Sequence, residues 1–117
     1  MADLTLWHNP RCSKSRQAKD ILDGAGAEFT EVRYVDAPPT AAELERVLTA
    51  LGMEPWDITR MGEDVAKELD LKHRAHDRAD WIGVLVANPI LIERPILISS
   101  DGRAVVGRPP ENVQQLL

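Results

Sequence analysis

The sequence predicts one α/β domain in which a β-α-β unit is followed by a helical block and then by a β-β-α segment. Three observations indicate this class: a change from strand-like to helical period near residue 13, a capped amphipathic helix from residue 40, and a hairpin signal near residue 100. A chain of 117 residues can bury a core without disulfides. We therefore expect a single domain over residues 1–117, with a helical insertion at about residues 40–88.

The β-α-β unit occupies the first third of the chain. Residues 4–7 form a short β-type run that ends at His8-Asn9-Pro10, and a helical period begins at Ser13. Gly24 indicates the end of that helix. Residues 29–35 are rich in β-branched and aromatic residues, which predicts a second strand.

The helical block begins with a capping signal. Thr40 and Glu43 have the spacing of a capping box, and Gly52 indicates the C-terminal end of the helix that follows. From residue 55 to about 87 no strand pattern is visible. We expect two or three short helices there.

The last segment carries a hairpin signal. The strand-like runs 96–98 and 104–106 flank Ser100-Asp101-Gly102-Arg103, which is typical of a tight turn. Pro110 then opens a last helix. Its predicted core face consists of Val113, Leu116 and Leu117.

Composition excludes several classes of protein. The chain has 14 Lys and Arg against 19 Asp and Glu, a net charge of −5, which disfavours binding to nucleic acid. A single cysteine, Cys12, allows neither an internal disulfide nor a multi-thiolate zinc site, which indicates a reducing compartment. The first residues lack the pattern of a secretion signal, and no apolar run approaches the about 20 residues that span a bilayer. We expect a cytoplasmic protein without a membrane partner.

Cys12 is the candidate nucleophile. It lies at the predicted strand-to-helix junction, where free N–H groups and the helix dipole stabilise a thiolate. Basic residues surround it in the sequence: His8, Arg11, Lys14 and Arg16. The alternative is an inert buried thiol, but such a thiol does not need basic neighbours. The pattern therefore favours a reactive cysteine.

Two narrower interpretations fail on spacing. A Cys-x-x-Cys dithiol would need a second cysteine where Ser15 stands, so an outside thiol must resolve any adduct on Cys12. A low-molecular-weight phosphatase loop would need an arginine where Ala18 stands. These absences leave a single-thiol enzyme as the working hypothesis.

Two other groups of residues have simpler interpretations. His73, His76 and Asp77 resemble a fragment of a metal site, but they offer no fourth ligand, and we predict no metal. Trp56 and Trp81 have aliphatic neighbours at helical spacing, which predicts a place in the core.

Three separated motifs resemble the glutaredoxin-linked arsenate reductase family. They are His8-Asn9-Pro10-Arg11-Cys12-Ser13-Lys14-Ser15-Arg16, Asn88-Pro89-Ile90-Leu91-Ile92-Glu93-Arg94-Pro95-Ile96 and Gly107-Arg108-Pro109-Pro110. The likeness runs nearly end to end. Within the family the chain is most similar to the short bacterial branch.

The resemblance implies a thioredoxin-like fold with a helical insertion, and it implies roles for single residues. Cys12 would be the nucleophile, His8 would help to lower its pKa, and Ser15 would place a hydroxyl near the thiolate. Pro95 would be the cis-proline that faces the cysteine in this fold. The substrate oxyanion would be held by Arg60, Arg94 and Arg108.

The predicted hairpin gives two of these arginines a geometric reason to meet. Arg94 precedes its first strand and Arg108 follows its second, so antiparallel pairing would bring both to the same end of the sheet. Guanidinium groups bind tetrahedral oxyanions bidentately and stay charged at any working pH. The placement of Arg60 depends on the resemblance.

The implied function is arsenic detoxification by reduction of arsenate to arsenite. Glutathione would be the co-substrate, glutaredoxin would be the partner protein, and no cofactor would be bound. A second hypothesis keeps the fold and the thiol but changes the substrate to another oxyanion or a disulfide. A third is a redox-sensing regulator that binds RNA polymerase, although Ser15 excludes an intramolecular disulfide switch.

Overall fold

The computed structural model describes residues 3–117 of the chain. Met1 and Ala2, which the predicted domain includes, lie outside the described residues. Within the described part, no helix has the length and apolar character needed to cross a membrane.

The chain divides into two compact units. The first consists of the residues up to Ala37 together with Arg94–Leu117, and the second is Pro38–Glu93. The predicted helical insertion at about residues 40–88 lies inside the second unit. All of the strands belong to the first unit.

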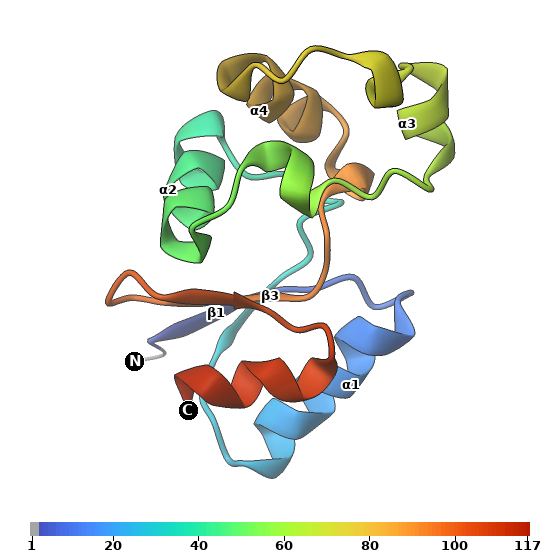
Figure 1. Cartoon of the computed structure of the whole chain (residues 1–117). Helices are drawn as coiled ribbons and strands as arrows, with labels where there is room; N and C mark the ends of the chain where they lie inside the picture. The colour runs from blue at the N-terminus through green and yellow to red at the C-terminus, as the bar shows by residue number, and fades with distance from the viewer. Residues whose placement is uncertain (1–2) are drawn as a thin grey trace. The chain divides into compact units, whose positions relative to one another are not determined.

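The first unit is built on a four-stranded mixed sheet of order β2-β1-β3-β4. Its strands are β1 (Leu4–Trp7), β2 (Thr30–Val32), β3 (Ile96–Ser99) and β4 (Ala104–Val106). β1 pairs in parallel with β2 and antiparallel with β3, which pairs antiparallel with β4. Helix α1 (Ser13–Gly24) connects β1 to β2, and it lies beside the C-terminal helix η4 (Pro110–Leu116) against one face of the sheet (Figure 1).

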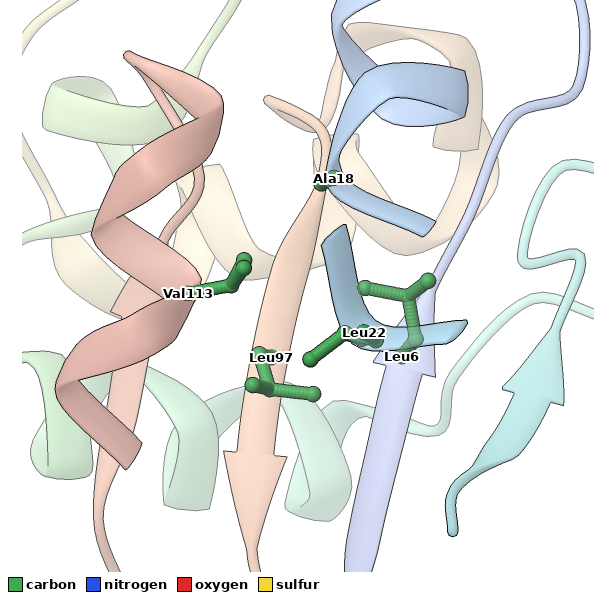
Figure 2. Packing of buried hydrophobic residues seen from close by; sticks show 5 residues of the cluster. All are labelled: Leu6, Ala18, Leu22, Leu97 and Val113. Atoms are coloured by element: carbon green, nitrogen blue, oxygen red, sulfur yellow. The ribbon is translucent and has the colours of Figure 1, made fainter. Parts of the chain in front are cut away.

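The register of the strands builds the core of this unit. Leu6 on β1 lies opposite Leu97 on β3, so both side chains point to the same face. That face is covered by α1 and η4, and the buried cluster joins side chains from all four elements (Figure 2). Its fully buried members are Leu6, Ala18, Leu22, Leu97 and Val113.

The second unit is helical, and it starts at the predicted capping box. The Glu43 N–H donates to Thr40 Oγ1 at 3.1 Å, and the Thr40 N–H donates to Glu43 Oε1 at 3.2 Å. Gly52 ends this helix in the left-handed region, at φ 68°. The elements are α2 (Ala41–Leu51), η1 (Pro55–Ile58), α3 (Asp64–Glu68), η2 (Leu71–His73), α4 (Arg78–Ala87) and η3 (Pro89–Leu91).

The tryptophans of this unit differ in burial. Trp81 is fully buried and donates its indole N–H to the Ala75 carbonyl at 2.9 Å, so its predicted place in the core is confirmed. Trp56 is only half-buried, so its predicted place in the core is wrong; its ring stacks on that of exposed His76, with the ring centroids 4.2 Å apart. His73 bonds to Asp70 at 2.8 Å. Among the described residues, no group of three or more His, Cys, Asp or Glu could hold a metal ion.

The α/β class and the order of the elements are confirmed, but some predicted boundaries are wrong. The strand predicted over residues 29–35 covers only Thr30–Val32, because the Arg33 carbonyl accepts the N–H groups of Asp36 and Ala37 and closes a turn. The last helix is a 3-10 helix, and Leu117 is exposed rather than part of its core face. The stretch predicted as two or three short helices contains the α-helices α3 and α4, as predicted, and also the 3-10 helices η1 and η2, which carry too few residues to show a period.

Gly107 is the glycine with the closest surroundings in the first unit. A Cβ atom built on it would lie 2.7 Å from Pro95 Cγ and 3.1 Å from Val113 Cγ1. A proline ring cannot rotate out of the way. Any side chain here would therefore displace the segment that carries Pro95.

We expect Gly107→Ala to lower the free energy of unfolding by about 1–3 kcal/mol, because the added methyl group overpacks a filled site. Gly24→Ala is the matched control, since a Cβ atom there meets nothing within 4 Å and alanine favours helix. Urea denaturation measures both changes. Equal stabilities for the two variants would contradict this account of Gly107.

Candidate active site

The loop between β1 and α1 holds Cys12 at the start of the helix. Cys12 is the N-cap residue of α1, with extended backbone at φ −93° and ψ 124°. Asn9 shapes the loop: its carbonyl accepts the Cys12 N–H at 3.0 Å, and its side-chain oxygen accepts the Arg11 N–H at 3.0 Å. Cys12 is therefore held, half-buried, at the N-terminus of α1.

Arg108 contacts the sulfur directly. Its Nη2 lies 3.3 Å from Cys12 Sγ, and its Nε donates to the Arg94 carbonyl at 2.8 Å. Arg94 precedes β3 and Arg108 follows β4, so the antiparallel pairing of these strands brings both arginines to the same end of the sheet, as the hairpin predicted. Arg94 is buried, with 7% of its surface exposed.

The surroundings of Cys12 favour its thiolate. Burial of the sulfur raises the pKa of the thiol, but the opposing groups outweigh burial and the net pKa is lowered. They are, in order, the Ser15 backbone N–H, the Arg94 side chain, the Lys14 backbone N–H and the charge of Arg108. The helix start and the arginine pair thus act on one atom.

His8 and Ser15 form a buried pair beneath the loop. His8 Nδ1 lies 2.7 Å from Ser15 Oγ, and Ser15 Oγ accepts the Asn9 N–H at 3.1 Å. Burial, only partly offset by the charge of Glu31, lowers the pKa of His8 below its ordinary 6.5, so the ring is neutral at pH 7. His8 therefore adds no positive charge near the sulfur at neutral pH.

The remaining predicted residues have different surroundings. Arg60 belongs to the second unit, where its Nε pairs with Glu63 at 3.2 Å and its Nη1 pairs with Glu93 at 2.8 Å. Its role in holding an oxyanion stays a prediction. The Arg94–Pro95 peptide bond is cis, the isomer that the resemblance implies, and Arg108–Pro109 is cis as well.

The basic residues next to Cys12 in the sequence point away from the protein interior. Arg11, Lys14 and Arg16 are all exposed. The Arg16 side chain closes over the loop, because its Nη1 donates to the Pro10 carbonyl at 2.8 Å. These three charges face the solvent from which a reactant would come.

Two residues of the site have no counterpart in the sequence prediction. Asn9 supplies the hydrogen bonds that shape the loop, and Glu31 on β2 places a carboxylate oxygen 4.0 Å from His8 Nε2. The Asn9-Pro10 pair is a turn signal that could have indicated the first. Nothing local to residue 31 indicates the second, which follows from the pairing of β1 with β2.

Comparison with known proteins identifies the family. The family model described as the ArsC family matches residues 7–116. The chain belongs to the ArsC family. This confirms the resemblance to the arsenate reductases that the three motifs indicate.

Individual relatives of the ArsC chain agree with this assignment. It is 37% identical to an arsenate reductase of Neisseria meningitidis, over 100% of both chains. It is 48% identical to an uncharacterized protein of Streptomyces viridochromogenes, over 97% of this chain and 98% of that one. The solved structure of an arsenate reductase from Vibrio cholerae matches with a TM-score of 0.93 at 34% identity, over 100% of both chains. The predicted thioredoxin-like fold with a helical insertion is thereby confirmed.

We expect the Cys12 thiol of this ArsC protein to ionise below the ordinary range for cysteine, so that iodoacetamide alkylates it rapidly at pH 7. Arg108→Ala should raise its pKa by half a unit or more, which slows alkylation about threefold at a pH well below the midpoint of the wild-type profile. The measurement is the alkylation rate as a function of pH. Arg103→Ala, which removes an exposed arginine paired with Asp101, is the control and should leave the profile unchanged. Identical profiles for Arg108→Ala and wild type would contradict the role of Arg108.

Proposed function

We propose that this protein reduces arsenate to arsenite, with glutathione as co-substrate and glutaredoxin as partner. One observation carries the proposal: the sulfur of Cys12, at the start of α1, lies 3.3 Å from Arg108 and is stabilised as a thiolate by Arg94 as well. Membership of the ArsC family, with relatives named arsenate reductase, supports arsenate as the substrate.

The arginine pair suits a tetrahedral oxyanion. Arsenate carries negative charge on oxygens that guanidinium groups bind through paired N–H donors. Arg108 is fixed between the sulfur and the Arg94 carbonyl, so an anion that it binds would be held next to the nucleophile. We propose Arg60 as a third ligand, which would require it to exchange part of its pairing with Glu63 and Glu93.

The proposed reaction begins with attack of the Cys12 thiolate on arsenic. An As–S bond forms, and one arsenate oxygen leaves as hydroxide or water. The glutathione thiolate then adds to the same arsenic and displaces a second oxygen. A glutaredoxin thiolate attacks the glutathione sulfur, the S–As electron pair passes to arsenic, and As(V) becomes As(III). The other product is a mixed disulfide of glutaredoxin and glutathione, and water releases arsenite from Cys12.

An outside thiol is needed because the chain has a single cysteine. The exposed side chains of Arg11 and Lys14 flank that cysteine in the sequence and would attract an anionic thiol such as glutathione. Glutathione is kept reduced in the cytoplasm. We therefore propose a cytoplasmic location for the reaction, with no resident cofactor.

We expect purified wild-type protein to release arsenite from arsenate only when glutathione and glutaredoxin are both present. Cys12→Ser should lower turnover by at least about 10³-fold, because a hydroxyl replaces the thiolate nucleophile. It should still bind arsenate, as measured by calorimetry. Arg94→Ala should lose about 10²-fold in turnover, because it removes a ligand of the oxyanion and also raises the pKa of Cys12.

The same assay separates the alternatives. Arsenite release by Cys12→Ser would contradict the nucleophile. Failure of wild type to release arsenite, combined with turnover of a disulfide or another oxyanion, would favour the second function considered for this fold.

We expect Arg60→Ala to raise the KM for arsenate about tenfold or more, because one charged hydrogen-bond donor to the substrate is lost. Steady-state kinetics at fixed glutathione and glutaredoxin measure this change. Glu63→Gln, which removes one of the Arg60 ion pairs but keeps the arginine, is the matched control. A fall in thermal stability with unchanged KM would instead assign Arg60 a structural role.

A further inference from the structure

A chain of polar contacts runs from Glu31 to the Cys12 loop. The Glu31 carboxylate, on strand β2, is held by Lys19 Nζ at 2.7 Å and Arg33 Nε at 3.0 Å. Its Oε1 also lies 4.0 Å from Nε2 of His8, and the other ring nitrogen of His8 lies 2.7 Å from Ser15 Oγ. All of these residues belong to the first unit.

The charges around His8 decide which ring nitrogen carries the proton. Lys19 first, and Arg33 next, lower the pKa of Glu31 against the opposing effect of burial, so its carboxylate is ionised at neutral pH. A neutral imidazole has one N–H, and a carboxylate favours an N–H directed towards it over a lone pair. At 4.0 Å the carboxylate acts on Nε2 through its charge rather than through a hydrogen bond, and we infer that it favours the proton on Nε2 and leaves Nδ1 of His8 as an acceptor.

That tautomer sets the direction of one hydrogen bond, the one between Ser15 and His8, while the backbone N–H groups of Asn9 and Cys12 donate with either tautomer. The Ser15 hydroxyl donates to His8 Nδ1 and accepts the Asn9 N–H at 3.1 Å. The Asn9 carbonyl in turn accepts the Cys12 N–H at 3.0 Å. With the opposite tautomer, Nδ1 would donate to Ser15 Oγ, and the Ser15 hydroxyl hydrogen would turn away from His8. Because Ser15 is fully buried, that hydrogen would lose its acceptor, which disfavours the arrangement of Ser15 and Asn9 that shapes the loop.

We propose that Glu31 is a positioning residue, which fixes the tautomer of His8 and, through Ser15 and Asn9, the loop that presents Cys12. In this proposal Glu31 acts on the sulfur only through His8, Ser15 and Asn9. The proposal concerns the thiol itself and rests on the proposed function only for its effect on turnover.

The direction in which one substitution changes the alkylation rate of Cys12 distinguishes a positioning role of Glu31 from a purely electrostatic effect. Glu31→Gln removes a negative charge and keeps the shape of the side chain. A carboxylate that acted only through space would destabilise the thiolate, so its removal would speed the alkylation of Cys12 at pH 7. Loss of positioning acts in the opposite direction, because the N–H groups of Lys14 and Ser15 lose their alignment with the sulfur.

We expect Glu31→Gln to raise the pKa of the Cys12 thiol by half a unit or more, which slows iodoacetamide alkylation about threefold or more at a pH well below the midpoint of the wild-type profile. We expect Glu31→Asp, which keeps the charge, to recover part of the rate. Asp101→Asn makes the same chemical change in an exposed ion pair with Arg103 on the β3–β4 hairpin and should leave the rate unchanged. An unchanged or faster rate in Glu31→Gln would overturn the proposal.

Nitrogen NMR of ¹⁵N-histidine-labelled protein tests the tautomer directly. The His8 signals are assigned by their loss in His8→Asn. Wild type should show the proton on Nε2, and Glu31→Gln should show a substantial population with the proton on Nδ1. An unchanged tautomer would overturn the proposal even if alkylation slowed. Neither measurement uses arsenate, so a failure of the proposed arsenate reaction would leave this result untouched.

Ser15→Ala gives the final check that the effect passes through the hydroxyl. In that background Glu31→Gln should change the alkylation rate by less than about 1.5-fold, because the chain of contacts is already cut. A threefold slowing that persists without the Ser15 hydroxyl would show that Glu31 acts by another route and would overturn the role given to Ser15.

Discussion

The stabilisation of one negative charge on a half-buried sulfur is the interaction on which the arrangement of the first unit depends. Burial alone would keep Cys12 protonated. The interactions that stabilise the thiolate must therefore outweigh the effect of burial on the pKa. These interactions have two sources: backbone N–H groups at the start of α1, and two guanidinium groups from the C-terminal part of the chain. The sheet brings the two sources together, because its register sets the end of β1 in line with the start of β3 and the end of β4.

The parts of the fold that the sequence predicts well are those with local causes. The capping box at Thr40 and Glu43, the left-handed glycine at residue 52 and the hairpin around Gly102 each depend on a few adjacent residues. The shortening of β2 also has a local cause, the turn closed by the Arg33 carbonyl, but the side chains of that stretch favour a strand and so conceal the turn. The 3-10 turns of the second unit are likewise too short for a period to reveal them.

The residues of the candidate site also differ in how far the sequence predicts them. Cys12 could be found from its basic neighbours and its position at a helix start, and pairing in a hairpin was enough to bring Arg94 and Arg108 together. The surroundings of His8 could not be predicted in this way, because the pairing of β1 with β2 is what brings Glu31 close to His8. The two residues are far apart in the sequence, and the motif that contains His8 does not indicate a carboxylate next to it. Membership of the ArsC family identifies relatives of the chain, but it does not by itself indicate the contact between Glu31 and His8.

The bond from Arg108 Nε to the Arg94 carbonyl restricts how this site can change during evolution. Lysine at position 108 could keep the charge but could not donate both to that carbonyl and to the sulfur, since it lacks the planar fork. A change at position 108 would therefore also disturb the backbone that carries Arg94. The dependence runs in one direction, because the carbonyl of residue 94 is present whatever its side chain: an exchange of Arg94 leaves this bond possible, whereas an exchange of Arg108 removes it.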